Sequence, residues 1–253
     1  MSEKWDSNQY LKFEDQRNQP AIDLLNRLAG FQPEAIADLG CGPGNSTMIL
    51  KKTFPRAEIL GIDSSEDMIS KAQREHGEVN FIKNDIRELQ GQYDLLFSNA
   101  CLQWVPDHQT LFPFLLTHLK PGGIFAAQFP MNDSEPLYQL IYELAGEERW
   151  GLKDVTLDYN GSLMPHEYFD LLSPLCHNVQ IWETKYYHNL HNHQALIEWI
   201  KGTRIRPYLA HLSPQDGEAF EYELLKRVQM KYPLMDNGEV ILHFNRFFIL
   251  GIR

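Results

Sequence analysis

The residues best suited to chemistry are an acid and three glycines in the run Asp38-Leu39-Gly40-Cys41-Gly42-Pro43-Gly44-Asn45. The apolar residues 35–37 predict a buried strand before the run, and residues 45–52 predict a helix after it, opened by three residues that favour helix caps. Glycines between a strand and a helix allow a sharp turn and close approach of a ligand. Their spacing differs from the usual dinucleotide fingerprint, and an acid before the loop repels phosphates. The loop therefore favours a cationic ligand.

Three further predicted strands end at polar residues. The strand 58–63 ends at Asp63, about 20 residues beyond the loop, where the ribose of an adenosine needs a carboxylate. Asp85 lies at the end of the strand 81–86, where it would accept from an adenine amino group, and Asn99 ends the strand 93–99. Residues 64–67 read as a capping box, so Met68 in the helix that follows would lie against the adenine.

Each of these acids alone is also explained as a solvated strand end or a helix cap. Together they share one sheet edge with the glycine loop, and ligands of open α/β sheets bind at that edge. An adenosine group that carries a positive charge satisfies both observations. The sequence thus favours S-adenosylmethionine over NAD.

Composition excludes several classes of protein. The chain has 253 residues, a net charge of −11 and three cysteines. The charge disfavours nucleic acid, and the unpaired cysteines indicate a reducing cytoplasm. We find neither an apolar run near 18 residues nor a signal-peptide pattern, so we expect no membrane partner. His188, His191 and His193 lack an acid or thiol at a suitable spacing, so we expect no metal.

Strands and helices alternate through residue 129, which predicts a parallel sheet with right-handed crossovers. Residues 120–123 read as a turn before the strand 124–129, and 179–188 and 240–252 read as later strands. Helical patterns cover 111–119, 135–150, 165–172, 194–201 and 214–232. We expect one domain, residues 1–253, with mainly helical insertions at 131–176 and 189–238 that form a substrate cap, and we expect the second insertion to be too small for a separate core.

The glycine loop, Gly61-Ile62-Asp63, Asn84-Asp85-Ile86 and Pro121-Gly122-Gly123 resemble the class I S-adenosylmethionine-dependent methyltransferases. The resemblance implies a Rossmann-like α/β sheet, mostly parallel with an antiparallel last strand, and a helical cap inserted near the C-terminus. It implies S-adenosylmethionine as cofactor. The cofactor-binding residues expected are Asp38, Gly40, Cys41, Gly42, Asn45, Asp63, Ser64, Met68, Asp85, Ile86, Asn99 and Ala100.

Segments outside the cofactor core resemble the trans-aconitate methyltransferases of that superfamily. They include residues 98–108, Tyr186-Tyr187-His188, residues 206–209 and residues 244–247. The resemblance implies a cytoplasmic enzyme that esterifies one carboxylate of trans-aconitate, a small polycarboxylate, and we expect a monomer. Two positions depart from the family pattern, Asn245 in place of proline and Arg204 in place of glycine. The substrate-binding residues expected are Tyr10, Arg17, Gln103, Trp104, Tyr187, His188, Arg206 and Arg246.

Methyl transfer to a carboxylate needs little from the protein except alignment. A carboxylate has a pKa near 4 and is ionised at neutral pH, so no general base is required, and we expect no catalytic residue in that sense. A tricarboxylate approaching a chain of net charge −11 needs a local cationic pocket, for which arginine is suited. The alternatives are a buried ion pair for Arg246, a solvated helix-end charge for Arg206, and a surface position for Arg17 and for Arg204.

Two other functions remain open at this point. One is methylation of another carboxylate, such as a malonyl thioester on a carrier protein. The other is a protein that binds S-adenosylmethionine without transferring the methyl group.

Overall fold

The computed structural model describes residues 14–155, 162–202 and 204–253, with side chains from residue 18 onward. The strands are β1 Ala35–Leu39, β2 Glu58–Asp63, β3 Asn80–Lys83, β4 Tyr93–Asn99, β5 Leu119–Pro130, β6 Asn178–Leu190 and β7 Val240–Ile252. The α-helices are α2 Glu14–Asn26, α3 Asn45–Thr53, α4 Glu66–Glu75, α5 His108–Thr117, α6 Pro136–Ala145, α7 Pro165–Leu172, α8 His193–Lys201, α9 Arg206–Leu209 and α10 Pro214–Lys231. The 3₁₀ helices are η1 Ile86–Glu88, η2 Leu102–Trp104 and η3 Glu148–Trp150.

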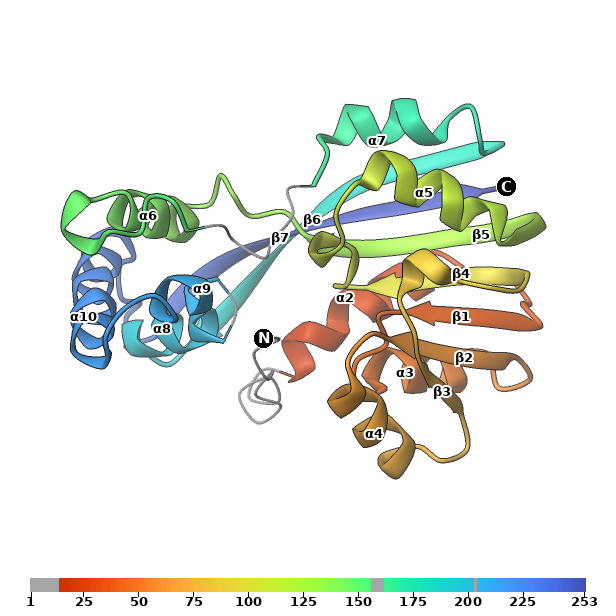
Figure 1. The fold of residues 1–253 in the computed structure, drawn as a ribbon, viewed down its shortest axis with the longest axis horizontal. Helices are drawn as coiled ribbons and strands as arrows, with labels where there is room; N and C mark the ends of the chain where they lie inside the picture. Colours follow the sequence, from red (N-terminus) through yellow and green to blue (C-terminus); the bar gives the residue numbers. More distant parts are fainter. Residues whose placement is uncertain (1–13, 156–161, 203) are drawn as a thin grey trace. The chain divides into compact units, whose positions relative to one another are not determined.

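The strands form one seven-stranded sheet in the order β3-β2-β1-β4-β5-β7-β6 (Figure 1). Strands β1 to β5 pair in parallel, and β7 runs antiparallel to β5. The order reverses at β1, whose neighbours are β2 and β4, so the carboxyl ends of β1, β2 and β4 meet at the point where ligands bind in open α/β sheets. The predicted fold class is confirmed.

Strand β5 begins earlier than we expected. The segment 120–123 was predicted as a turn, but it lies inside β5, where the pairing with β4 shifts between Tyr93–Leu119 and Leu95–Ile124. Gly122 has φ +77, a left-handed conformation that costs glycine little. The turn is thus present as an irregularity within the strand.

The chain divides into two compact units. The first, here the sheet unit, comprises Asp15–Met131, Tyr159–Thr184 and Arg246–Arg253, and the second, here the helical unit, includes Asn132–Asp158 and Lys185–Asn245. Strands β6 and β7 each contribute residues to both units.

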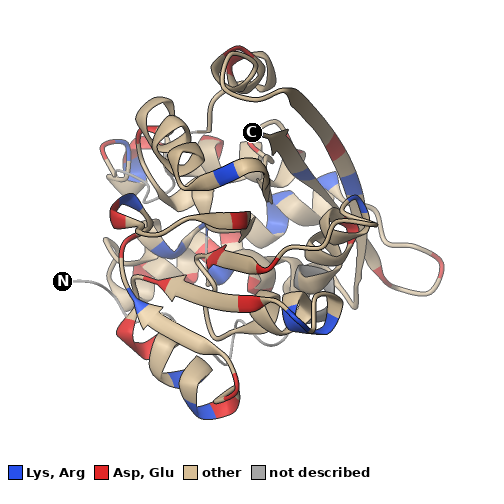
Figure 2. Ribbon diagram, turned by 90° about the vertical axis from the view of Figure 1, so that its right-hand side faces the viewer, with Lys and Arg blue, Asp and Glu red and all other residues tan. Residues whose placement is uncertain are grey.

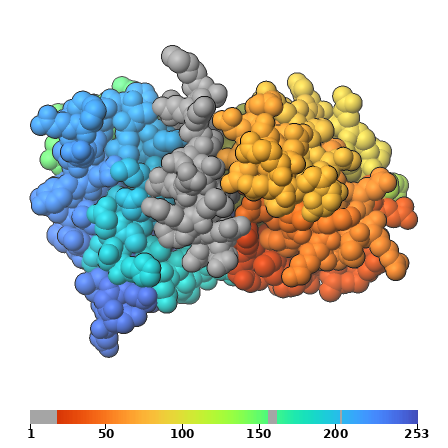
Figure 3. All heavy atoms as spheres, turned by 90° about the horizontal axis from the view of Figure 1, so that it is seen from below, coloured from red at the N-terminus to blue at the C-terminus, as the bar shows by residue number. Residues whose placement is uncertain are grey.

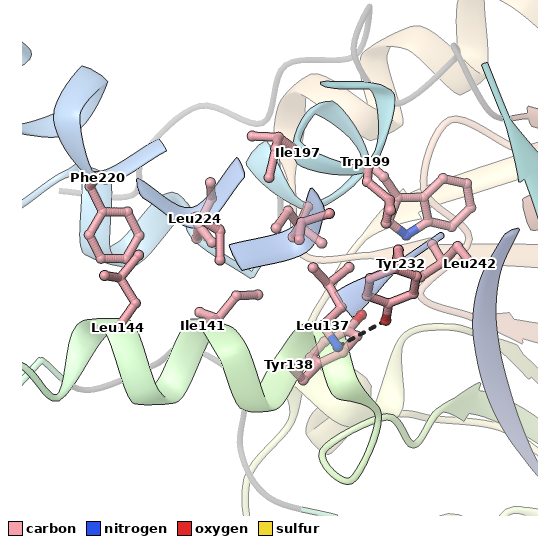
Figure 4. Packing of buried hydrophobic residues seen from close by; sticks show 14 of the residues in the cluster. Leu137, Tyr138, Ile141, Leu144, Ile197, Trp199, Phe220, Leu224, Tyr232 and Leu242 are labelled. Atoms are coloured by element: carbon pink, nitrogen blue, oxygen red, sulfur yellow. Dashed lines mark hydrogen bonds between the residues drawn. The ribbon is translucent and has the colours of Figure 1, made fainter. Parts of the chain in front are cut away.

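The helical unit has its own hydrophobic core, to which both insertions contribute. Helix α6 contributes Leu137, Ile141 and Leu144, and these residues pack in one cluster with Phe220 and Leu224 of α10 (Figure 4). The backbone N–H of Leu137 also donates to the hydroxyl of Tyr232 at 3.0 Å. We had considered the second insertion without this helix, and α6 supplies the apolar surface that it lacked.

The sheet unit has a second core on one face of the sheet. It includes Leu39 of β1, Phe112 of α5 and Phe247 of β7. Tyr168 and Leu172 of α7 also belong to it, so α7, which we had placed in the first insertion, packs on the sheet. The role of the insertions as a substrate cap stays a prediction.

Acidic and basic residues are interspersed on several elements, including α4 and α10 (Figure 2). The region of α3 and α4 forms part of the surface of the sheet unit (orange in Figure 3), where Glu66, Asp67 and Arg74 of α4 are exposed. Within the described ranges, no helix is both long and apolar enough to cross a membrane.

Candidate active site at the carboxyl edge of the sheet

The glycine loop joins β1 to α3 as expected, and the structure favours glycine at each of its three glycine positions for a different reason. Gly40 has φ +73, and a Cβ there would lie 2.2 Å from Sγ of Cys101. Gly44 has φ +101 and occupies the N-cap of α3, so the helix has no side-chain cap, contrary to our expectation for Asn45, Ser46 and Thr47. Gly42 has φ +56, and a Cβ there would meet no described atom within 4 Å. The loop thus leaves open space beside Gly42, where a ligand would approach.

Asp38 is fully buried at the end of β1. Its Oδ2 accepts from the hydroxyls of Ser46 at 2.7 Å and Thr47 at 2.6 Å, so these two residues bind the acid instead of capping α3. No described group donates a hydrogen bond to Oδ1. Burial raises the pKa of Asp38 to about 6, partly opposed by the two hydroxyls. An unsatisfied buried carboxylate oxygen suits a cationic partner.

Asp63 ends β2 and holds the loop. Its Oδ2 accepts from the backbone N–H of Gly42 at 3.0 Å, and its Oδ1 accepts from that of Ser65 at 2.8 Å. Burial raises the pKa of Asp63. A carboxylate offers about four acceptor sites, so two remain for the hydroxyls of a ribose.

The end of β2 leads into α4 one residue later than we expected. Ser65, rather than Ser64, caps the helix and accepts from the backbone N–H of Met68 at 3.4 Å. Met68 and Asn45 are half-buried, and Ser64 is exposed.

Asp85 is hydrogen-bonded to Arg87. Its carboxylate accepts from Nε of Arg87 at 2.9 Å and Nη2 at 2.5 Å, and this hydrogen bonding lowers its pKa. It also caps η1, which was the alternative that the sequence left open. The side chain of Ile86 is in the core of the sheet unit, so its backbone remains for contact with a ligand.

The end of β4 has a strained backbone. Ala100 follows Asn99 with φ +57, which is unfavourable for a residue with a Cβ. Its N–H donates to the carbonyl of Gln128 at 2.8 Å, and its carbonyl accepts from Nε2 of Gln103 at 2.7 Å. Gln103 is 2% exposed, and no described group donates to its Oε1. The strain fixes the direction in which the chain leaves the sheet.

The strand register places five polar side chains on one face of the sheet. Asp38 pairs with Gly61, two residues before Asp63, and with Phe97, two residues before Asn99. Asn99 pairs with Gln128, which pairs with Phe248, two residues after Arg246. Because side chains of one strand alternate between faces, Asp63, Asp38, Asn99, Gln128 and Arg246 share a face in strand order. The row runs from two carboxylates through two amides to a guanidinium.

Gln128 was missed by the sequence analysis. It is fully buried and donates from Nε2 to Oδ1 of Asn99, while its Oε1 accepts from Nη1 of Arg246 at 3.5 Å. Arg246 is 5% exposed. A single amide inside the apolar strand 124–129 was the available signal, since buried polar groups need partners.

His108 and Tyr168 also lie outside the predicted site and support it. Nε2 of His108 donates to the carbonyl of Leu102 at 2.8 Å, so Nδ1 accepts from the hydroxyl of Tyr168 at 2.5 Å. Both side chains are buried, and burial lowers the pKa of His108. They anchor η2, which carries Gln103 and the half-buried Trp104.

Burial also affects the two thiols beside the loop. It raises the pKa of both Cys41 and Cys101, and the nearby Asp38 and Asp63 act in the same direction. The thiols are therefore protonated at neutral pH. Cys41 contributes to the site through its backbone position in the loop.

Three predicted substrate residues lie in the helical unit. Tyr187 is 61% exposed and lies edge-on to His243, with ring centroids 4.9 Å apart. His188 is buried, and its ring centroid lies 4.9 Å from that of Trp199. Arg206 is half-buried at the start of α9. Tyr10 and the side chain of Arg17 fall outside the described residues.

The two departures from the family pattern meet at adjacent residues of the helical unit. Arg204, which we expected at the surface, is buried, pairs with Asp133 and donates to the hydroxyl of Tyr142. The backbone N–H of Asn245 donates to Oδ1 of Asn132 at 2.6 Å, a bond that proline cannot make. Arg204 and Asn245 therefore both bind the segment that follows β5, through Asp133 and Asn132.

Comparison with known proteins gives an independent result. A family model described as a methyltransferase domain matches residues 36–123. Trans-aconitate 2-methyltransferase of Escherichia coli strain 55989 is 41% identical over 251 residues, which cover 98% of each chain.

Two solved structures share the fold. The YcgJ protein of Bacillus subtilis has a TM-score of 0.59 at 17% identity and covers 93% of this chain and 98% of its own. Phosphoethanolamine N-methyltransferase 2 of Haemonchus contortus, solved with phosphomonomethylethanolamine and S-adenosylhomocysteine, has a TM-score of 0.55 at 17% identity. That match covers 92% of this chain and 52% of the other.

Proposed function

The chain belongs to the trans-aconitate 2-methyltransferase family, and on that premise we propose that it methylates one carboxylate of trans-aconitate. The methyl donor is S-adenosylmethionine, and the products are the monomethyl ester and S-adenosylhomocysteine. The observation that carries the proposal is the row of side chains from Asp63 and Asp38 to Arg246 on one sheet face. Its acidic end suits a cationic cofactor and its basic end suits an anionic substrate.

The residues of the acidic end fit the cofactor. The open space beside Gly42 and the unsatisfied Oδ1 of Asp38 would receive a charged group, and Asp63 retains acceptor sites for ribose hydroxyls. The N-terminus of α3 has no side-chain cap, so its backbone N–H groups suit the cofactor carboxylate. When bound, S-adenosylmethionine supplies an electrophilic methyl group on a sulfonium.

The chain's own contribution is alignment. Strand spacing near 4.8 Å separates β2 from β7, four strands away, by roughly 19 Å, so a cofactor bound at one end of the row and an acid bound at the other would meet between them. A substrate carboxylate is ionised at neutral pH and needs no proton removed. Orientation of reacting groups can supply about 7–11 kcal/mol of a reaction barrier. We therefore assign no general base.

We further propose that the protein acts as a cytoplasmic monomer on a free small acid, without nucleic acid or a membrane. The net charge of −11 supports this, since a polyanionic partner would be repelled except at a local cationic group such as Arg246. Tyr187, His188 and Arg206 stay predictions for contacts with the other carboxylates.

The test is methyl transfer from labelled S-adenosylmethionine to a panel of di- and tricarboxylic acids, read as base-labile methyl ester. We expect label on trans-aconitate above cis-aconitate, isocitrate and citrate. Label on another acid would show that the enzyme methylates that acid instead of trans-aconitate. Label only on a malonyl thioester of a carrier protein would show that the substrate is bound to a carrier protein. If the cofactor binds and no acid is labelled, the protein is a binder and the proposal fails.

A further inference from the structure

We infer that Gln128 is a positioning residue, whose neutral amide orients Arg246 toward a substrate carboxylate. The inference rests on the proposed function, in which Arg246 binds the acid. Gln128 is fully buried on β5, between the strand that carries Asn99 and the strand that carries Arg246.

The orientation of the Gln128 amide is set by its two neighbours. A guanidinium only donates hydrogen bonds, so Oε1 of Gln128 must face Nη1 of Arg246, 3.5 Å away. Nε2 then faces Oδ1 of Asn99, to which it donates. The backbone of Gln128 adds a third contact, because its carbonyl accepts from the N–H of the strained Ala100 at 2.8 Å. One residue therefore links the predicted cofactor side of the edge to the predicted substrate side.

The neutrality of this acceptor matters to the chemistry. A carboxylate at position 128 would bind a guanidinium through a charge-assisted hydrogen bond, about twice as strong as one from an amide. It would then compete with the incoming acid for the same donor. An amide orients the guanidinium and adds no charge that competes with the ligand.

The discriminating experiment compares two substitutions of similar size. Gln128→Glu keeps an acceptor for Arg246 but adds a charge, whereas Gln128→Met keeps the volume and removes both hydrogen bonds. We expect Gln128→Glu to raise the KM for the acid by about tenfold or more, and Gln128→Met to raise it less. We expect the dissociation constant of S-adenosylmethionine to change by less than about threefold in both.

A purely structural role predicts the reverse order. Gln128→Met would then be worse, because it leaves two buried polar groups without their partner. Equal or reversed effects of the two substitutions on the KM would overturn the inference. Ser98→Ala is the matched control, since Ser98 is buried on β4 on the opposite face and its hydroxyl donates to the carbonyl of Leu39 at 3.0 Å. We expect it to leave the KM for the acid unchanged.

A second readout does not depend on activity. The ¹⁵N and ¹H signals of the Arg246 guanidinium, assigned by their loss in Arg246→Lys, report its environment. We expect Gln128→Glu to shift these signals in the absence of acid, and Ser98→Ala to leave them in place. Unshifted signals in Gln128→Glu would overturn the inference even in an active enzyme. If the wild-type protein methylates no acid, the proposed function fails, and this comparison still tests the contact between Gln128 and Arg246.

Discussion

Asp38 is a buried carboxyl group whose protonation is coupled to what binds beside it. Its pKa, raised by burial to about 6, makes the ionised form unfavourable in the folded protein. The folded state therefore binds the extra proton between pH 3.8 and about 6, and its unfolding free energy falls as pH rises through that window. At neutral pH this costs about 3 kcal/mol. A bound cation offsets that cost by stabilising the carboxylate.

The affinity for S-adenosylmethionine should consequently depend on pH. Below about pH 6 a proton must leave Asp38 before the cation binds, so we expect the affinity to fall by up to tenfold per pH unit between pH 6 and 5. Above pH 6.5 it should be level. Calorimetric titration at several pH values measures this, with Asp38→Asn as the comparison, which should bind weakly and without that dependence. A constant wild-type affinity from pH 5 to 7 would contradict a cationic ligand at Asp38.

Arg206 gives a second prediction at the level of single residues. If its guanidinium binds a substrate carboxylate, Arg206→Ala should raise the KM for the acid by about tenfold, equivalent to about 1.4 kcal/mol, with little effect on cofactor affinity. Arg149→Ala is the control, since Arg149 is paired with Glu147 and half exposed. Equal kinetics in the two variants would remove Arg206 from the substrate site.

At the scale of elements, the position of η2 depends on a contact between distant parts of the chain. The hydroxyl of Tyr168 in α7 bonds His108, and it also accepts from the N–H of Leu163 at 3.3 Å. The buried imidazole of His108 and the half-buried N–H of Leu163 therefore each lose a partner in Tyr168→Phe. We expect the unfolding free energy to drop by about 1–3 kcal/mol and activity to fall with the displacement of Gln103. Urea denaturation measures the first effect, and Phe169→Tyr, at an exposed position of the same helix, is the control.

The same contact predicts a pH dependence of stability. Burial lowers the pKa of His108, so the unfolded state binds the extra proton below about pH 6.5. The unfolding free energy contributed by this residue is complete above that pH and is lost as pH falls toward the lowered pKa. His108→Gln should reduce the slope in that window, and an unaltered slope would show that other groups cause it.

These elements also show what sequence could and could not predict. The loop and the strand-end acids were found because each strand and its ligand-facing end are adjacent in the chain. The bond between His108 and Tyr168 joins residues 60 positions apart, and Gln128 is recognisable only once the register is known. The cap of α3 was misjudged because Ser46 and Thr47 have a stronger partner in Asp38 than in the helix backbone.

At the scale of the whole molecule, two cores support two units. Phe220 is fully buried in the helical unit, where its ring packs edge-on against Trp150 with centroids 5.3 Å apart. We expect Phe220→Ala to cost about 3–5 kcal/mol and to accelerate hydrogen exchange in α6, α8 and α10 more than in β1 and β4. Phe112→Ala in the sheet unit should show the opposite pattern. Uniform acceleration in both variants would mean that the units unfold as one.

The place of β7 in the sheet has a consequence for the order of events during synthesis. It lies between β5 and β6, so residues 246–252 fill an interior position although every other strand of the sheet precedes them in the chain. Until they leave the ribosome, the backbone groups of β5 that pair with β7 have no partner. In the nascent protein, the edge of β5 that includes Gln128 therefore stays unpaired until β7 adds to the sheet.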